Sequence, residues 1–306
     1  MPIALRTKLD GRAALVTLVT WAALMSASAH AMAQDRLARG QYIFNLAGCE
    51  GCHTDKKNKG PRLGGGRAFK TDYGTFYSPN ITPERTTGIG DWSFKNFKRA
   101  LREGIAPDGS HYFPAFPYTS YTHMTDEDLT ALWTYLQAQP AVTQTNSAHK
   151  LRAPFRWRWL MVFWNALYLD PGPKADWSRG RYIVEALSHC QECHTPRNML
   201  GGYRRDMAFA GTKRNPEGIA IPNITPDPQT GVGKWKAPDF DMLLTIGMLP
   251  DGDFVGGVMS ESVSHSTSKM TAQDRKSTIK HLQSLPPIHN PVKAPKAKET
   301  GGNEWD

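Results

Sequence analysis

The stretch Cys49-Glu50-Gly51-Cys52-His53, with its second copy Cys190-Gln191-Glu192-Cys193-His194, decides the fold of this 306-residue chain. On a helical turn, residues three and four positions apart share one face. Each stretch therefore sets two thiols beside one imidazole, which is the spacing of a covalent c-type haem attachment site. We expect two haem c groups per chain, held by Cys49, Cys52, Cys190 and Cys193, with His53 and His194 as axial ligands of the two irons.

Three other interpretations fit a Cys-x-x-Cys pair: a structural disulfide, a thioredoxin-type redox pair, or half of a zinc site. A zinc site needs a second ligand pair nearby, and here the other pair lies more than a hundred residues away. A redox pair does not require the trailing histidine. The haem interpretation also uses every cysteine in the chain, and we prefer it for that reason.

The N-terminus has the layout of a secretory signal peptide, which we assign to residues 1–33. Basic residues precede an apolar run over residues 13–25, and small residues end at Ala31-Met32-Ala33, so cleavage is expected before Gln34. A membrane anchor is the alternative, but the run is short for a span. Because haem attachment to paired thiols belongs to an export compartment, the expected location is a bacterial periplasm.

The charge of the chain does not indicate a nucleic-acid partner. Removal of residues 1–33 takes away three basic side chains and one acidic one, which lowers the formal net charge from +9 to +7. The basic residues are scattered, and the densest group, residues 56–62, lies in a loop beside the first cysteine pair. Such a group fits an acidic protein partner or solvated surface better than a nucleic-acid groove.

The sequence contains one unit twice. Residues 79–109 align with residues 222–252 without a gap and share fifteen identities in thirty-one positions, beginning with Pro-Asn-Ile-Thr-Pro in both. The correspondence extends upstream, where Arg39-Gly40-x-Tyr42-Ile43 matches Arg179-Gly180-x-Tyr182-Ile183. We therefore expect a tandem duplication: a first domain over 34–145, a connector over 146–174, a second domain over 175–287, and a disordered tail over 288–306.

Both domains should be helical, and no convincing alternating strand appears. Apolar residues recur with a helical period over 92–102, before Gly104. The last helix of each domain should begin at Thr125 and at Thr271, which are followed by acidic residues in the first turn. We therefore expect two all-α domains, each too small to bury much hydrophobic core without its porphyrin.

The connector contains an aromatic-rich segment over residues 151–169. Such a segment is consistent with a helix that lies on a membrane surface. It is also consistent with a connector packed into the crevice between the two domains. Pro154 and Pro171 frame the segment and basic residues interrupt its start, which favours the connector.

An electron-transfer haem usually has a ligand at its remaining axial position, and we expect methionine there in both domains, since its thioether raises the haem potential. Met124 is the only methionine between His53 and the end of the first domain. Met124 as a core filler is the alternative role, and His111 or His123 stay open as ligands of the same iron. In the second domain Met270 sits beside the capping threonine as Met124 does, while Met259 corresponds to Phe116. Met248 is a weaker candidate.

The ordered motifs resemble the cytochrome c subunits of periplasmic membrane-associated dehydrogenases, including those of alcohol dehydrogenase and gluconate 2-dehydrogenase. The motifs are Arg-Gly-x-Tyr, Cys-x-x-Cys-His-Thr, Pro-Asn-Ile-Thr-Pro, Gly-x-Gly-x-Trp, the stretch at residues 113–118, and Met-Thr-Asp-Glu-Asp. The resemblance implies two tandem class I cytochrome c domains. It also implies Met259, in its Gly-Gly-x-Met context, as the second sixth ligand, and we choose Met259 over Met270.

The resemblance further implies a function. Such subunits relay electrons from a dehydrogenase catalytic subunit to quinone or to a downstream cytochrome or oxidase, and they have no substrate chemistry of their own. Peripheral association with the inner membrane stays open. The best known members carry three haem motifs, whereas this chain has two, so it looks like a shorter dihaem relative.

Two haem enzymes are rival functions. A dihaem peroxidase needs an iron whose distal position can open, which methionine ligation of both irons disfavours. A thiosulfate-oxidising dihaem enzyme needs a cysteine axial ligand, and no spare cysteine exists. The electron carrier is therefore preferred, with the peroxidase as the alternative.

Overall fold

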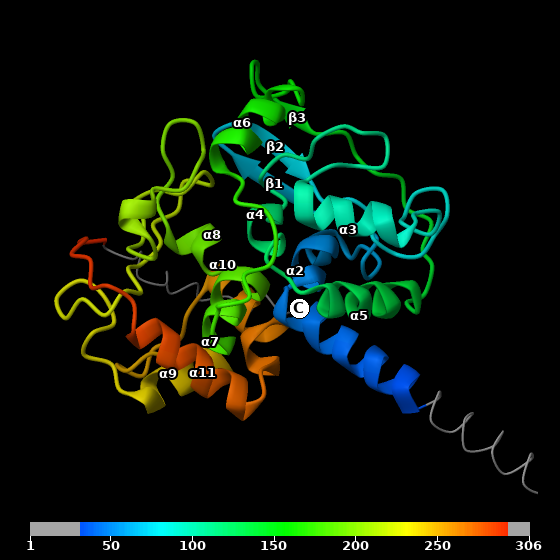
Figure 1. Ribbon diagram of the computed structural model, residues 1–306. Helices are drawn as coiled ribbons and strands as arrows, with labels where there is room; N and C mark the ends of the chain where they lie inside the picture. Colours follow the sequence, from blue (N-terminus) through cyan, green and yellow to red (C-terminus); the bar gives the residue numbers. More distant parts are fainter. Residues whose placement is uncertain (1–30, 293–306) are drawn as a thin grey trace, which may run out of the picture.

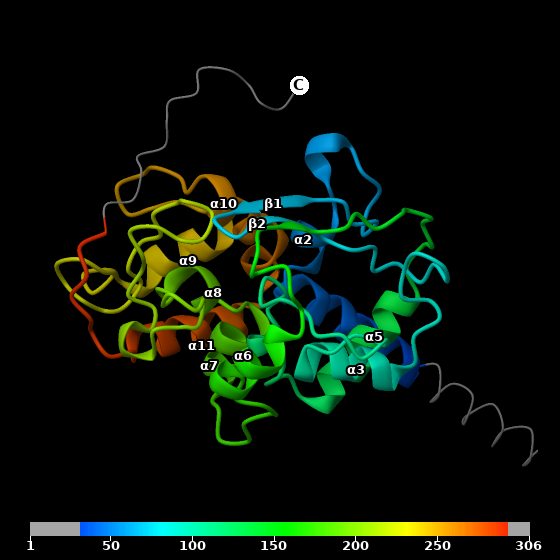
Figure 2. The same cartoon turned by 90° about the horizontal axis from the view of Figure 1, so that it is seen from above.

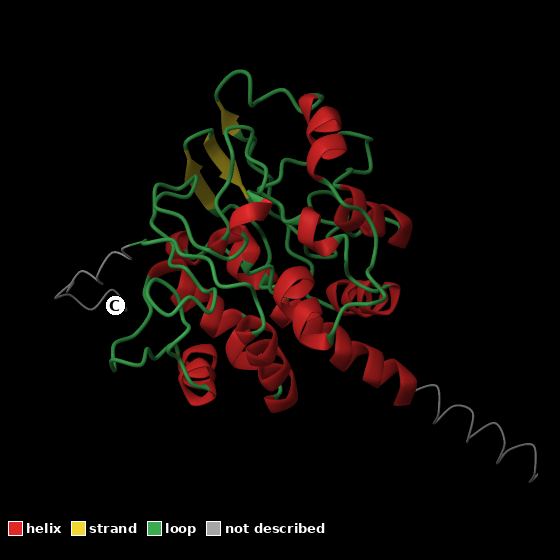
Figure 3. Cartoon of the chain, turned by 60° about the vertical axis from the view of Figure 1, so that its left-hand side comes forward, coloured by secondary structure: helices red, strands yellow, loops and turns green. Residues whose placement is uncertain are grey.

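The computed structural model describes residues 31–292, which form a helix-rich molecule with one small sheet (Figures 1 and 3). Residues 31–46 are helical and lead into the first cysteine motif. The labelled helices follow in chain order: α2 (Cys49–His53), α3 (Phe94–Glu103), α4 (Tyr118–Tyr121), α5 (Asp126–Gln137), α6 (Leu160–Tyr168), α7 (Arg179–Arg181), α8 (Gln191–His194), α9 (Ala237–Ile246), α10 (Gly257–His265) and α11 (Ala272–Gln283). A π-helical turn over Tyr182–Leu187 continues α7, and single 3₁₀ turns lie at Lys56–Asn58, Arg205–Met207 and Thr267–Lys269.

The expectation of no strands was wrong in one place. Strands β1 (Ala68–Thr71) and β2 (Gly74–Tyr77) form an antiparallel hairpin in which Ala68 pairs with Tyr77. Strand β3 (Lys150–Leu151), from the connector, pairs with β2. These strands are four residues long or shorter, so too few side chains alternate for a pattern to be visible in the sequence.

The predicted end of α3 at Gly104 and the predicted starts of α5 and α11 are confirmed, while α3 begins two residues later than expected. Ser93 caps α3 through its side chain, and Gly104 ends it in a left-handed conformation with φ of 65°. Thr125 caps α5 by accepting a hydrogen bond from the Asp128 amide. Thr271 caps α11 in the same way through the Asp274 amide. In each repeat, then, local sequence sets where the last helix begins.

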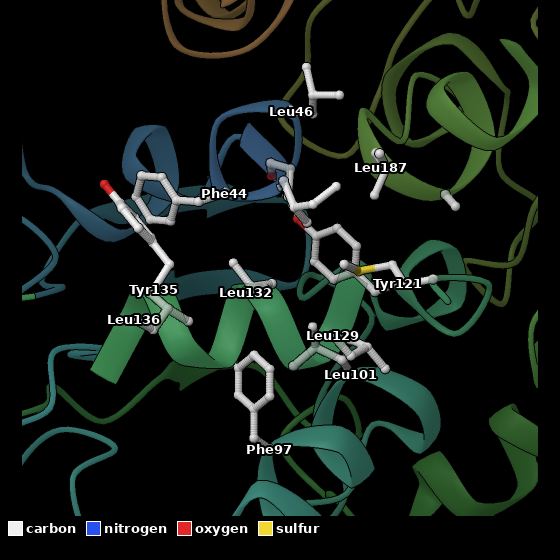
Figure 4. Packing of buried hydrophobic residues seen from close by; sticks show 14 of the residues in the cluster. Phe44, Leu46, Phe97, Leu101, Tyr121, Leu129, Leu132, Tyr135, Leu136 and Leu187 are labelled. Atoms are coloured by element: carbon white, nitrogen blue, oxygen red, sulfur yellow. Dashed lines mark hydrogen bonds between the residues drawn. The ribbon is translucent and has the colours of Figure 1, made fainter. Parts of the chain in front are cut away.

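The larger of two hydrophobic clusters contains residues of both repeats. Figure 4 shows Leu46 and Tyr121 of the first repeat above α5, with Leu187 of the second repeat beside them. Ile183 and Met270 of the second repeat belong to the same cluster. A second cluster, around Phe240, lies wholly within the second repeat. The repeats are therefore packed against each other through apolar side chains from both.

Two glycines allow the first and last helices of each repeat to touch. A Cβ atom at Gly40 would overlap the carbonyl oxygen of Ala131 in α5, and one at Gly180 would overlap the carbonyl oxygen of Ser277 in α11. Glycine is the residue that permits such a close backbone approach. This crossing brings residues 31–46 against α5, and α7 against α11, beside the cysteine motifs that follow (Figure 2).

The connector touches both repeats through one face of α6. Asn165 accepts a hydrogen bond from the Tyr118 hydroxyl at 2.6 Å, and Trp164 donates one to the Leu200 carbonyl at 2.9 Å. The opposite face of α6 is exposed. Helix α6 therefore contacts both repeats through one face, and it does not lie in a closed crevice.

Residues 288–290, which we assigned to the tail, hydrogen bond to the second repeat. Asn223 donates to the Ile288 carbonyl at 2.7 Å, and the Asn290 amide donates to the Thr230 hydroxyl at 2.9 Å. Between residues 31 and 292, no helix combines the length and the apolar character needed to cross a bilayer. Most of the expected signal peptide lies outside the described residues.

Candidate haem attachment sites

Each cysteine motif forms a short helix at the end of a longer one. Helix α2 spans the whole first motif, and α8 spans the second from the residue after Cys190. Cys49, Cys190 and Cys193 are half-buried and Cys52 is exposed, and none of the four forms a disulfide. Both thiols of a motif are therefore available on one helical turn, as covalent attachment to one porphyrin edge requires.

The two histidines make the same hydrogen bond in both repeats. His53 Nδ1 lies 2.8 Å from the carbonyl oxygen of Pro79, and His194 Nδ1 lies 2.9 Å from that of Pro222. A carbonyl can only accept, so Nδ1 carries the proton and Nε2 keeps a free lone pair. Burial lowers the pKa of both imidazoles, which favours the neutral form. Each ring is thus held in the tautomer that ligates iron through Nε2.

Burial raises the pKa of three of the four thiols. The pKa values of Cys49, Cys190 and Cys193 rise to about 12, because a charged thiolate is unfavourable away from water. Within the described part of the chain, no group of three or more His, Cys, Asp or Glu side chains could hold a metal ion. The donor set fits a porphyrin tethered through two thioethers and does not fit a zinc site.

The loop after each motif folds back in the same way. Thr54 Oγ1 accepts the Leu63 amide at 3.0 Å, and Thr195 Oγ1 accepts the Phe209 amide at 3.0 Å. The histidine carbonyls also accept amides from later glycines, Gly65 and Gly211. These bonds close the loop under each histidine and fix where its ring points.

The asparagine of each repeated Pro-Asn-Ile-Thr block makes the same set of hydrogen bonds in both repeats. Asn80 accepts hydrogen bonds from the amide and hydroxyl of Thr82, and it donates to the Val142 carbonyl at 2.7 Å. Asn223 repeats this set with Thr225 and Ile288. Each asparagine is buried. Sequence reasoning found the block as a repeated motif but missed these bonds, which tie it to a later segment of the chain directly after the proline whose carbonyl contacts the histidine.

Comparison with known proteins agrees with this geometry. The family model Cytochrome c matches residues 37–140. A dihaem cytochrome c-type protein of Cereibacter sphaeroides is 40% identical over 263 residues, which cover 82% of this chain and 86% of the relative. The chain belongs to the cytochrome c family.

This cytochrome is also similar to subunits of larger dehydrogenases. It is 36% identical to the fructose dehydrogenase cytochrome subunit of Gluconobacter japonicus over 85% of its own length, and 33% identical to the gluconate 2-dehydrogenase cytochrome c subunit of Pantoea cypripedii over 89%. It spans only 54% and 64% of those two relatives. The suspected relationship to dehydrogenase cytochrome subunits is thereby confirmed.

The candidates for the sixth ligand of the first haem occupy different surroundings in this cytochrome. Met124 is fully buried just before the N-cap of α5. His123 Nδ1 contacts the Gly172 carbonyl at 2.8 Å, and its ring packs on Trp177. His111 Nδ1 lies 3.3 Å from the Asn165 amide nitrogen. Both histidines contact the connector region through Nδ1, which leaves Nε2 free as in His53, so these contacts do not decide between the two histidines and Met124.

In the second repeat, the structure separates the two methionines. Met270 is buried in the shared core, and its sulfur accepts a hydrogen bond from the Thr278 hydroxyl at 3.9 Å. Met259 is half-buried on α10, and no such bond to its sulfur is present among the described residues. Met270 lies two residues before α11 and is buried as Met124 is, so burial does not exclude it; Met259 stays our candidate because the family resemblance points to it.

Proposed function

We propose that the chain is an exported dihaem cytochrome c with two tandem class I domains, over 34–145 and 175–287, joined by the aromatic connector over 146–174. The observation that carries this proposal is the pair of His–Pro hydrogen bonds, His53 with Pro79 and His194 with Pro222. One such bond could be accidental, but the same bond beside the same motif in both repeats indicates two equivalent haem sites.

Each haem c would supply an iron that takes up and releases one electron. The protein would hold it through four groups in each domain. Two cysteines form the thioether tethers, a histidine binds the iron through Nε2, and a methionine closes the sixth position. In the first domain these are Cys49, Cys52, His53 and Met124, and in the second they are Cys190, Cys193, His194 and Met259.

The cytochrome would receive electrons from the catalytic subunit of a dehydrogenase and pass them to quinone or to a downstream cytochrome or oxidase, in the periplasm. The proposal is supported by the relatives that are named as cytochrome subunits of fructose, gluconate and alcohol dehydrogenases. None of these relatives is named a peroxidase.

The first test is a haem count. Protein matured with an export-linked haem attachment system should give two haems per chain by the pyridine haemochrome assay. A colourless, correctly processed product would refute the proposal. Rapid turnover of hydrogen peroxide by the fully loaded protein in a stopped-flow assay would favour the peroxidase instead. Co-purification with a cofactor-containing dehydrogenase would support the partner, and migration as a lone species would argue for a free shuttle.

We also propose that this cytochrome lies on an anionic membrane surface through the outer face of α6. Large apolar side chains protrude from α6 and from the neighbouring loop, at exposures between 49% and 96%: Trp159, Val162, Phe163, Leu167, Met199 and Leu200. Trp164 holds that loop to α6 through the Leu200 carbonyl. A helix face of this composition is typical of proteins that bind at the membrane interface.

The charge around this α6 face indicates anionic headgroups. No acidic residue lies between Asp128 and Asp170, while Lys150, Arg152, Arg156 and Arg158 lie within that interval. An apolar face next to a segment with basic and no acidic residues suits a bilayer that contains anionic phospholipid.

The membrane proposal is tested by flotation of the holoprotein with vesicles. Binding should be strong with phosphatidylglycerol vesicles, weak with phosphatidylcholine vesicles, and reduced by salt. The pair Phe163→Ser and Leu167→Ser should lose binding. The matched pair Met242→Ser and Ile246→Ser, on exposed positions of α9, should keep it. If the α6 pair still binds vesicles but no longer binds the dehydrogenase, this face contacts the catalytic subunit instead.

A further inference from the structure

The last helix of each repeat, α5 or α11, receives hydrogen bonds at its N-terminus from a tyrosine of the other repeat. The Tyr182 hydroxyl donates a hydrogen bond to Asp128 Oδ2 at 2.6 Å and accepts the Thr125 amide at 3.1 Å. In an ordinary capping box, the acidic side chain at the third helical position would itself accept the amide of the capping residue. Here the hydroxyl of Tyr182 stands between the two groups, so a residue of the second repeat completes the N-terminus of α5.

The second contact mirrors the first. The Tyr42 hydroxyl donates to Asp274 Oδ2 at 2.7 Å and accepts the Thr271 amide at 3.2 Å. The first repeat thus completes the N-terminus of α11, as the second completes that of α5. Reciprocal contacts of this kind are the mark of a two-fold interface. The two repeats are packed like the subunits of a symmetric dimer that share one chain.

Both carboxylates are also held within their own repeat. Arg39 Nε donates to Asp128 at 2.7 Å, and Arg179 donates to Asp274 through Nε and Nη2 at 2.9 and 2.6 Å. Removal of a tyrosine hydroxyl therefore leaves each buried carboxylate paired with its arginine. Substitution of these tyrosines by phenylalanine should weaken the contact between repeats without leaving an unpaired buried charge.

The haem attachment motifs border this interface. Gln191, between the cysteines of the second motif, donates to the Ser120 hydroxyl of α4 at 3.1 Å. Gly51, inside the first motif, packs against His265 of α10. The Tyr121 hydroxyl donates to the Ala47 carbonyl at 2.8 Å, and its ring lies 5.5 Å from the ring of His189. Each repeat thereby covers the attachment helix of the other.

We propose that Tyr42 and Tyr182 are positioning residues that lock the two haem domains into one arrangement for electron transfer between the haems. This inference rests on the proposed function, because it requires two haems. A hydrogen bond to a charged group typically shifts an equilibrium by about ten- to a hundredfold. Loss of either hydroxyl should increase the fraction of separated domains by about that factor.

The test compares the wild-type holoprotein with the double variant Tyr42→Phe and Tyr182→Phe. One haem is reduced by a light-triggered donor, and electron arrival at the other is followed. The wild type should show one fast phase and unfold in one transition. The double variant should keep both haems, show a slower second phase, and unfold in two transitions. Should the double variant lose a haem, each single variant is measured and interpreted in the same way.

The control variant is Tyr118→Phe, which loses a hydroxyl bonded to Asn165 at 2.6 Å, outside the reciprocal contact. It should keep the fast phase and the single transition. If the double variant only lowers the unfolding midpoint, with one transition and one fast phase, the tyrosines have a structural role and the positioning proposal is wrong. A haem count below two in the wild type would refute the proposed function instead.

Discussion

The two repeats agree on one side of each haem site and differ on the other. On the histidine side, the His–Pro distances are 2.8 and 2.9 Å, and the asparagine anchors make matching bonds. On the opposite side, Phe116 packs between Tyr112 and Tyr121 in the first repeat, where the register of the second repeat has Met259. The two repeats have therefore kept the surroundings of the histidine alike, whereas the positions of Phe116 and Met259 have diverged.

The proposed sixth ligands of the two haems come from different positions in the two repeats. Met124 lies directly before the capping threonine of α5, whereas Met259 lies on α10, well ahead of α11. The repeat counterpart of Met124 is Met270, which is buried and bonded to Thr278. If both ligands are as proposed, the methionines of the two irons come from different segments of the repeat. The surroundings of the two irons then differ, and so should their reduction potentials.

The largest expected effect comes from removal of the tethers of one haem. Cys49→Ser with Cys52→Ser, or Cys190→Ser with Cys193→Ser, should each reduce the haem count from two to one, because each pair would hold one porphyrin by thioether bonds. The pyridine haemochrome assay measures this count. Loss of both haems from either pair would mean that the two sites do not mature separately.

The next effect should distinguish the sixth ligands. Met124→Ala and Met259→Ala should each remove the near-infrared sulfur-to-iron band of one haem in the oxidised protein, and lower that haem's potential, because a thioether ligand raises it. The potential is measured by a spectroelectrochemical titration.

Met270→Ala is the matched control for the two ligand variants. It should leave the band intact and lower the free energy of unfolding by about 2–5 kcal/mol, as truncation of a buried methionine does. An unchanged band in Met124→Ala would refute its assignment, and a lost band in Met270→Ala would restore the symmetric pair.

Sequence reasoning could predict what depends on local patterns. The helix caps at Thr125 and Thr271, the cysteine motifs and the repeat were all readable because each is set by a few neighbouring residues. The hairpin at β1 and β2 was not, because its strands are too short to show a period. The roles of Tyr42 and Tyr182 were also missed, although both tyrosines were seen in the repeated motif. Their partners lie more than fifty positions away along the chain, and only the packing of the repeats brings them together.

A smaller effect should come from the helix crossings, and it should be similar in both repeats. Gly40→Ala and Gly180→Ala each place a methyl group against a carbonyl oxygen of the opposing helix. Each should lower the free energy of unfolding by about 1–3 kcal/mol, since the crossing helices must move apart. Chemical denaturation measures the change. Gly256→Ala, where an added Cβ meets nothing within 4 Å, is the control. A large difference between the two repeats would show that only one crossing is tight.

The smallest effect should be a dependence on acid from the reciprocal contact in the second repeat. Burial alone would raise the pKa of Asp274, but hydrogen bonds from Arg179 and Tyr42, with the arginine charge, outweigh it and hold that pKa below its usual value. The unfolded chain therefore binds the proton more readily than the folded one, so the stabilisation by Asp274 is complete above about pH 4 and is lost as the pH falls through the lowered pKa.

Denaturation midpoints between pH 7 and pH 3 should fall less steeply in Tyr42→Phe than in the wild type, because one of the bonds that lower this pKa is gone. Tyr118→Phe should follow the wild-type curve. If all three proteins lost stability in parallel, the Tyr42 hydroxyl would not contribute to the ionisation of Asp274, and the bond between the repeats would be weaker than its 2.7 Å length indicates.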